Sequence, residues 1–113
     1  MSEPRRNDHV RVRPRRLRRT SALRQLVTET RLHPSDLVLP LFYREGLVSP
    51  KAIPSMPGVV QHTEDSLRVA VNDAAAAGLG GIMLFAVPEK RDELGSGATD
   101  PDGALNFAVR TAL

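Results

Sequence analysis

Residues 63–88, TEDSLRVAVNDAAAAGLGGIMLFAVP, contain a helix pattern followed directly by a strand pattern. Thr63 can cap the helix, and the two acids after it lie in the first turn, where the helix dipole favours negative charge. Apolar residues at spacings of three and four form one face of this helix: Leu67, Ala70, Val71, Ala74 and Ala75. Gly78 can end the helix in the left-handed region, so the sequence predicts a helix between Thr63 and Gly78.

Two short apolar runs lie on either side of this helix. They are Leu37-Val38-Leu39-Pro40-Leu41-Phe42 before it and Ile82-Met83-Leu84-Phe85-Ala86-Val87 after it. Such runs are typical of strands that are buried on both faces. A strand, a crossover helix and a second strand form one βαβ unit, which implies parallel pairing and a right-handed connection. Because a proline cannot donate to a ladder, we expect the first strand to pair on one side only at Pro40, or to begin near it.

The rest of residues 32–113 is predicted to form loops and one further helix. Residues 43–62 contain three prolines and two glycines, which indicates a loop of a length that is usually functional. After the second strand, a charged loop over residues 89–97 leads to Asp100-Pro101-Asp102, where a helix can start. We expect an open-ended βαβα pattern that stops before a third strand.

The charges divide the chain into two parts. Residues 1–31 contain ten arginines against three acids, a net charge of +7, whereas residues 32–113 have a net charge of −4. Residues 1–19 are too polar to bury a core and are expected to form an extended arm. We therefore predict a basic N-terminal arm with a short helix over residues 1–31, followed by the α/β segment over residues 32–113.

The short helix is expected at the end of the arm. Thr20 or Ser21 can cap it, and its narrow apolar stripe consists of Leu23, Leu26 and Val27. His33-Pro34 is expected to end it, because the residue before a proline is disfavoured in the helical region.

Six arginines of the arm are close together in the sequence: Arg11, Arg13, Arg15, Arg16, Arg18 and Arg19. They could neutralise phosphates and give salt-sensitive nucleic-acid binding. No aromatic residue lies among them to stack on bases, which argues against a specific reader of nucleic acid. A solvated arm, or an arm docked on an acidic neighbour, is favoured instead, and because the remainder of the chain is acidic a second copy is a suitable dock.

The composition excludes several kinds of site. The chain has no cysteine, which rules out disulfides and thiolate metal sites within it. The arm has no apolar signal region and no run approaches ~18 apolar residues, so we expect a soluble, cytoplasmic protein without membrane contact. The three histidines, His9, His33 and His62, have no partner at metal-ligand spacing.

The few candidate reactive groups have simple interpretations. Lys51 and Lys90 lie in exposed-looking loops where nothing would keep the amine neutral, so neither is expected to form a Schiff base. Gly95-Ser96-Gly97 lacks the spacing of a phosphate-binding loop and is expected to be a plain turn. The acids Glu89, Asp92 and Glu93 are expected to be solvated. We therefore predict no catalytic, cofactor-binding or metal-binding residue in this chain.

Five segments taken together resemble the porphobilinogen synthase (delta-aminolevulinic acid dehydratase) family. In order, they are Arg13-Pro14-Arg15-Arg16-Leu17-Arg18-Arg19, Leu37-Val38-Leu39-Pro40-Leu41-Phe42, Ser55-Met56-Pro57-Gly58-Val59, Gly81-Ile82-Met83-Leu84-Phe85 and Gly95-Ser96-Gly97-Ala98. The resemblance implies an α/β fold that is the start of a (β/α)8 TIM barrel, its first two strands and helices, preceded by an extended N-terminal arm. The arm would join a neighbouring subunit of a homo-oligomer, a homooctamer, through Arg13, Arg15, Arg16, Leu17, Arg18 and Arg19.

The resemblance also implies a lyase reaction, in which two molecules of 5-aminolevulinate condense to porphobilinogen in the biosynthesis of haem and other tetrapyrroles. In this family two lysines form Schiff bases with the substrates, and a divalent metal, magnesium or zinc, is bound. These groups belong to later strands and loops, and a complete barrel needs ~250 residues. We therefore expect an N-terminal fragment that is inactive alone. Two alternatives stay open: a non-catalytic module that joins synthase oligomers, and an arginine-rich nucleic-acid binder.

Overall fold

The computed structural model describes residues 14–113, and the chain divides into two compact units, Met1–Arg31 and Leu32–Leu113. Arg11 and Arg13 of the predicted arm lie outside the described residues. No helix within residues 14–113 is long and apolar enough to cross a membrane.

The described part of the first unit has two short helical segments and no core. They are the 3-10 turn η1 (Arg16–Arg18) and the helix α1 (Ser21–Leu26), and neither has a buried residue. Thr20 caps α1 as predicted, because its Oγ1 accepts a hydrogen bond from the backbone N–H of Leu23 at 3.1 Å.

The end of α1 differs from the prediction. The helix ends at Leu26, well before His33-Pro34, since a single apolar stripe without a packing partner does not sustain a longer helix. His33 instead caps a second 3-10 turn, η2 (Pro34–Asp36), in the second unit. Its backbone N–H donates to Asp36 Oδ2 at 2.9 Å, so this histidine has a local structural role.

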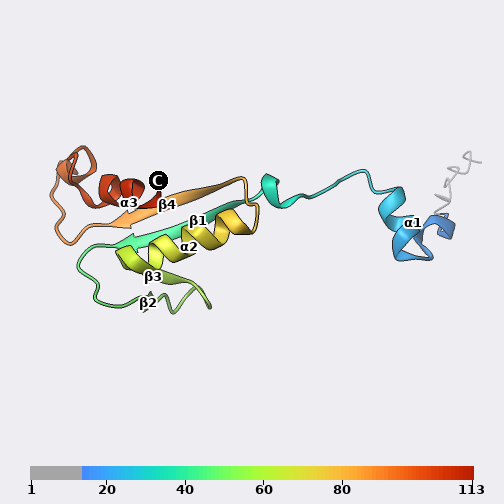
Figure 1. Ribbon diagram of the computed structural model, residues 1–113, viewed down its shortest axis with the longest axis horizontal. Coiled ribbons are helices and arrows are strands. Elements are labelled where there is room, and N and C mark those ends of the chain that lie inside the picture. Colours follow the sequence, from blue (N-terminus) through green and yellow to red (C-terminus); the bar gives the residue numbers. More distant parts are fainter. Residues whose placement is uncertain (1–13) are drawn as a thin grey trace, which may run out of the picture. The chain divides into compact units, whose positions relative to one another are not determined.

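The second unit is built on one sheet, shown in Figure 1. Its strands are β1 (Val38–Arg44), β2 (Lys51–Ala52), β3 (Val60–His62) and β4 (Gly81–Val87), in the order β2-β3-β1-β4. β1 and β4 pair in parallel over their full length, from Val38 opposite Gly81 to Arg44 opposite Val87. The predicted parallel βαβ unit is therefore confirmed.

The predicted loop over residues 43–62 is wrong in part, because it contains β2 and β3. β3 pairs in parallel with β1, but only at Phe42 and Tyr43, and β2 pairs antiparallel with β3. These strands are two and three residues long, too short for a periodicity to be visible. At Pro40 the ladder is one-sided, with β4 alone beside it, as predicted.

Three helical segments follow β3: α2 (Glu64–Ala76), the 3-10 turn η3 (Ser96–Ala98) and α3 (Ala104–Ala112). α2 begins with a capping box, in which Thr63 Oγ1 accepts from the N–H of Ser66 and Ser66 Oγ accepts from the N–H of Thr63. Gly78, at φ +74°, follows its end. The helix predicted from residues 63–78 is confirmed, and α3 begins slightly after its predicted start at Asp100-Pro101-Asp102.

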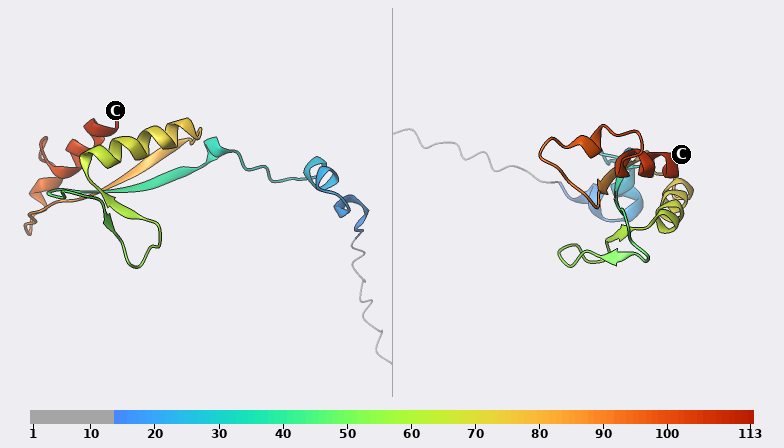
Figure 2. Two further views of the ribbon diagram at one scale, coloured as in Figure 1. Left: turned by 60° about the horizontal axis from the view of Figure 1, so that its bottom comes forward. Right: turned by 90° about the vertical axis from the view of Figure 1, so that its left-hand side faces the viewer.

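The core lies between α2, α3 and one face of the sheet. Its buried residues are Leu41, Tyr43, Leu67, Ala104 and Ala108. Both helices lie on the same side of β1 and β4 (Figure 2).

The opposite face of β1 and β4 is uncovered, so the expectation that both faces are buried is wrong for residues 14–113. Val38, Met83 and Phe85 are 56%, 53% and 45% exposed. Neither helix reaches this face, and alternate residues of the same apolar run therefore have opposite environments.

Candidate functional site

The carboxyl ends of the parallel strands place several polar side chains at one edge of the sheet. β1, β3 and β4 run in the same direction, and they end at Arg44, His62 and Val87. In open and closed parallel sheets, ligands bind where the strands end in their carboxyl direction. We therefore consider this carboxyl edge as the candidate site.

Glu45 joins the exits of β1 and β4. Its backbone N–H donates to the carbonyl of Val87 at 3.1 Å, and its Oε2 accepts from the N–H of Glu89 at 3.0 Å. Gly46 follows at φ +76°, where a side chain would be strained, and a Cβ there would lie 3.5 Å from the Glu89 carboxylate. The two loops thus leave the sheet at fixed positions relative to each other.

The loop after β4 is organised around Asp92. Its Oδ1 accepts from the backbone N–H of Ser96 at 2.9 Å, and its Oδ2 accepts from the Ser96 hydroxyl. The side-chain hydrogen bond from Ser96, supported by backbone hydrogen bonds, lowers the pKa of Asp92 below its ordinary value. Asp92 is exposed to solvent as expected, and its carboxylate also holds the turn η3, which Gly95 precedes as N-cap.

The same loop is fastened to α3 further along. Asn106 Nδ2 donates to the carbonyl of Asp100 at 2.6 Å, and Arg110 Nη1 donates to the carbonyl of Pro101 at 2.6 Å. Gly103 packs so closely on the carbonyl oxygen of Gly97 that a Cβ there would collide with it. The loop between β4 and α3 is consequently a bonded structure rather than a free connection.

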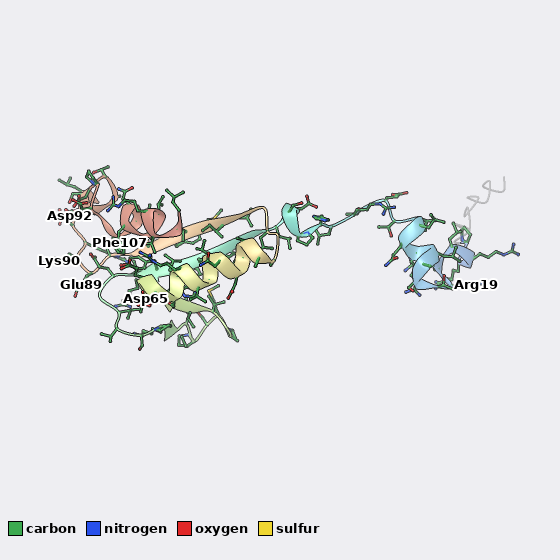
Figure 3. The ribbon with its side chains drawn as sticks, in the orientation of Figure 1. Arg19, Asp65, Glu89, Lys90, Asp92 and Phe107 are labelled. Atoms are coloured by element: carbon green, nitrogen blue, oxygen red, sulfur yellow. The ribbon has the colours of Figure 1, made fainter. Side chains whose placement is uncertain are left out.

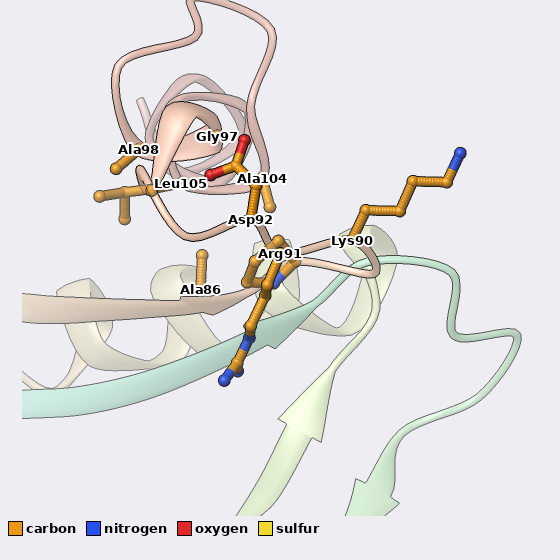
Figure 4. A pocket seen from close by; sticks show the side chains of 10 residues that line it. Ala86, Lys90, Arg91, Asp92, Gly97, Ala98, Ala104 and Leu105 are labelled. Carbon is orange, nitrogen blue, oxygen red and sulfur yellow. The ribbon is translucent and has the colours of Figure 1, made fainter.

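Two open cavities lie beside this loop. The first, of about 290 Å³, has a mostly apolar wall that includes Ala86, Pro88 and Leu105. The second, of about 520 Å³, is more polar and includes Glu45 and Glu89. In Figure 4 the side chain of Lys90 extends away from the first cavity, so its amine does not reach into the apolar space.

The uncovered sheet face carries an aromatic pair next to the carboxyl edge. Phe42 and Phe85 are opposite each other in the β1–β4 register, and their rings stack with centroids 5.3 Å apart and an interplanar angle of 19°. Met83 lies next to Phe85 on this face. These side chains form an apolar surface that can pack against further protein or against a flat or aliphatic ligand.

Two further titratable groups near the edge, His62 and Tyr43, have structural roles. Burial lowers the pKa of His62, whose Nδ1 lies 3.0 Å from Ser66 Oγ in the cap of α2. Burial raises the pKa of Tyr43, and the carboxylates of Glu45 and Glu64 add to this effect. The ring of Tyr43 packs on Phe107 in the core, with centroids 5.7 Å apart.

Of the residues singled out from the sequence, Glu89, Lys90 and Asp92 all line the second cavity at this edge. Lys51 lies in β2 rather than in a loop, and both it and Lys90 are exposed. Residues 14–113 contain no group of three or more His, Asp or Glu side chains that could hold a metal ion. His9 lies outside the described residues. Within the described part, the four arm arginines and the leucine predicted to contact a partner are exposed: Arg15, Arg16, Leu17, Arg18 and Arg19.

Sequence reasoning missed three features of the site: the Glu45 contact, the Asp92–Ser96 turn and the Phe42–Phe85 pair. A usable signal existed for Glu45, because an acid directly after a parallel strand lies at the carboxyl edge. For Phe42 and Phe85 the sequence offers no such signal, because Phe42 is the sixth residue of its apolar run and Phe85 is the fourth. Only the strand register places them opposite each other.

Comparisons with known proteins agree with one another. The family model of delta-aminolevulinic acid dehydratase matches residues 11–112. The chain is similar to delta-aminolevulinic acid dehydratases from Streptomyces coelicolor (57% identity over 101 residues, 88% of this chain and 31% of the relative), Mycobacterium tuberculosis (56% over 106 residues, 92% and 32%) and Bacillus subtilis (41% over 97 residues, 86% and 30%). The chain thus spans about a third of the length of the curated relatives it matches.

A solved structure gives the same result. It is delta-aminolevulinic acid dehydratase (porphobilinogen synthase) of Toxoplasma gondii in complex with the reaction product porphobilinogen, with a TM-score of 0.78 and 34% identity. The match covers 92% of this chain and 30% of that one. The match confirms the α/β fold class expected from the sequence. This chain corresponds to the first part of the solved protein's fold.

Proposed function

The chain belongs to the delta-aminolevulinic acid dehydratase family, and we propose that it forms the N-terminal part of a porphobilinogen synthase. The complete enzyme would be a lyase that condenses two molecules of 5-aminolevulinate to porphobilinogen in tetrapyrrole biosynthesis. The proposal rests on the family match over residues 11–112 and on the structural similarity to a protein that holds this product.

The observation that carries the proposal is the one-sided cover of the β1–β4 pair. In a (β/α)8 barrel the helices surround the outside and the strands present their other face to the interior. α2 and α3 cover one face, and the uncovered face is apolar. We therefore assign Val38, Phe42, Met83 and Phe85 to the barrel interior.

The chain's own contribution to the active site is positional. Active sites of these barrels lie at the carboxyl ends of the strands. Phe42 and Phe85 would supply an apolar wall there, and Glu45 and Asp92 would hold the two loops that frame it. Because Lys51 and Lys90 are exposed, neither is assigned to Schiff-base formation, which needs an amine kept neutral by its surroundings.

The Schiff-base lysines and the divalent metal implied by the family are assigned to other parts of the complete enzyme. Residues 14–113 do not fit a metal ion, since no group of three or more His, Asp or Glu side chains comes together among them. We propose that residues 1–113 alone are inactive, that the enzyme acts in the cytoplasm, and that the arm joins subunits of a homo-oligomer through Arg13, Arg15, Arg16, Leu17, Arg18 and Arg19.

A chimera tests this function. Residues 13–113 replace the corresponding segment of the Streptomyces coelicolor relative, and porphobilinogen formation from 5-aminolevulinate is measured colorimetrically. We expect activity within about tenfold of the unmodified relative, because the two chains are 57% identical over 101 residues. Residues 1–113 alone, assayed in parallel, should form no product. A folded chimera without activity, or product formation by residues 1–113, would contradict the proposal.

A further inference from the structure

Ser21, the first residue of α1, offers an accessible hydroxyl group. The residue is exposed, and its hydroxyl forms no hydrogen bond with any of residues 14–113. The neighbouring hydroxyl of Thr20 is already engaged, because its Oγ1 accepts from the N–H of Leu23 at 3.1 Å. Of these two adjacent hydroxyl groups, that of Ser21 is therefore the one available for reaction.

Exposed arginines precede this hydroxyl in the sequence. Arg18 and Arg19 lie three and two residues before Ser21, and Arg15 and Arg16 lie further upstream. All four arginines are exposed and form no ion pair among residues 14–113. The side chain of Arg19 extends away from the ribbon in Figure 3. No other Ser or Thr of the chain has basic residues at both of these positions, so a partner that selects this spacing would select Ser21 alone.

Protein kinases with an acidic substrate groove make such a selection. Kinases discriminate between substrates by the pattern of charges around the acceptor hydroxyl. A guanidinium pairs with carboxylates of the groove through charge-assisted hydrogen bonds. This mode of recognition needs no aromatic side chain from the substrate, so the lack of aromatic residues among the arginines does not count against it, as it does for a specific reader of nucleic acid.

The local structure allows Ser21 to enter a kinase groove, where we expect the substrate segment to be extended. α1 has six residues, and none of them is buried. A helix of this length is marginal in water without tertiary packing, so it opens at little cost in free energy. Ser66 and Ser96, by contrast, are held in the cap of α2 and in the turn at Asp92.

We propose that Ser21 is a phosphorylation site for a protein kinase that recognises Arg18 and Arg19 before it. In the reaction, the hydroxyl oxygen of Ser21 forms a bond to the γ-phosphorus of ATP, and the bond from that phosphorus to the oxygen bridging to the β-phosphorus breaks. ADP leaves, and the hydroxyl proton passes to a base of the kinase. ATP is the only co-reactant that the transfer needs.

The phosphate would change the charge of the arm. Residues 14–31 contain six arginines and one acid, a net charge of +5, and a phosphoserine adds about −1.5 to −2 at pH 7. Arg24 lies three residues after Ser21 on the same helix, and its Nε donates to the carbonyl of Arg18 at 2.9 Å. The phosphate oxygens can therefore pair with arginines of the same arm and withdraw them from another molecule. This consequence rests on the proposed role of the arm in joining subunits, which phosphorylation would weaken.

Incubation of the full chain with ATP and the catalytic subunit of cAMP-dependent protein kinase tests the site, with peptide mass spectrometry as the measurement. We expect one phosphate, on Ser21, and none in Ser21→Ala. Arg18→Ala/Arg19→Ala should lower kcat/KM for phosphorylation at least about tenfold, because each arginine loses its carboxylate partner in the groove.

The matched control removes two arginines that lie further from the hydroxyl. Arg15→Ala/Arg16→Ala makes the same change of charge and should stay within about threefold of the native kcat/KM, since these residues lie outside the recognised positions. Absence of phosphate, phosphate on another residue such as Thr20, or an equal loss in the two double variants would overturn the assignment of Ser21.

Sedimentation velocity separates the site from its consequence. In about 50 mM NaCl, where exposed charges are screened little, we expect the native chain to self-associate and phosphorylation to weaken this at least about fivefold. Ser21→Ala treated with the kinase should associate like the untreated native chain. If the native chain is monomeric, or associates equally after deletion of residues 1–31, the proposed role of the arm fails and the site stands. If the deletion abolishes association but phosphorylation leaves it unchanged, the role of the arm stands and the regulatory consequence is wrong.

Discussion

The two faces of the β1–β4 pair are both largely apolar and have opposite environments. Leu41 and Tyr43 are buried under α2 and α3, whereas Val38, Met83 and Phe85 on the other face are 45–56% exposed. Both sets come from the same apolar runs, in alternation. The difference shows that α2 and α3 cover one face only, and that the second face of residues 32–113 presents apolar side chains that a further packing partner could cover.

The largest expected effect is on the covered face. Leu67 of α2 is fully buried in the core. Leu67→Ala should lower the free energy of unfolding by about 2–5 kcal/mol, because it removes a buried side chain and leaves a cavity. Chemical denaturation of the full chain, followed by circular dichroism, measures the change. A loss below about 1 kcal/mol would mean that the covered face is not the main source of stability.

A neighbouring pair compares the faces directly. Leu84 packs against the core, and Phe85, the next residue, lies on the uncovered face. Leu84→Ala should cost about 2 kcal/mol of unfolding free energy and Phe85→Ala about 1 kcal/mol, mostly its stacking on Phe42. In the active chimera the order should reverse, with Phe85→Ala giving the larger loss of porphobilinogen formation. If Leu84→Ala causes the larger loss in both the unfolding and the activity assay, the uncovered face has no separate role in activity.

A smaller effect on the unfolding free energy is expected at the N-terminal cap of α2, one of the two helices that cover the core. Thr63→Ala removes the hydroxyl that accepts from the N–H of Ser66 in the cap of α2. The unfolding free energy should fall by about 1 kcal/mol. Thr63→Ser, which keeps the hydroxyl, is the matched control and should recover most of the loss. If both variants lose equally, the cap does not stabilise the covering helix.

The smallest expected effect is on the pH dependence of stability, and it concerns Asp92 in the loop after β4. Its pKa is lowered in the folded chain from the ordinary 3.8, so its contribution to stability is complete above that value and is lost as the pH falls through the lower, folded pKa. Acid unfolding of Asp92→Asn should therefore show a flatter dependence on pH below about 4 than the native chain. An unchanged slope in Asp92→Asn would show that the Ser96 contact does not persist in solution.

The helix between Thr63 and Gly78, the parallel strands on both sides of it and the family were predictable, because each depends on a local pattern. The apolar runs could not reveal which of their residues would be covered, since alternation is invisible when every position is apolar. β2 and β3 depend on pairing between distant residues, and their two and three residues carry no period. The Asp92 turn was not predictable because it depends on hydrogen bonds from Ser96 to an exposed carboxylate, which no local sequence pattern specifies.

Pro40 limits how far β3 can slide along β1. Backbone N–H groups alternate between the two sides of a strand, and that of Glu45 points to β4, so the nitrogen of Pro40, five residues earlier, faces the β3 side. Having no hydrogen, it cannot extend that ladder toward the amino end. The β2–β3 hairpin is thereby confined to the carboxyl half of β1, beside the loops that frame the proposed site.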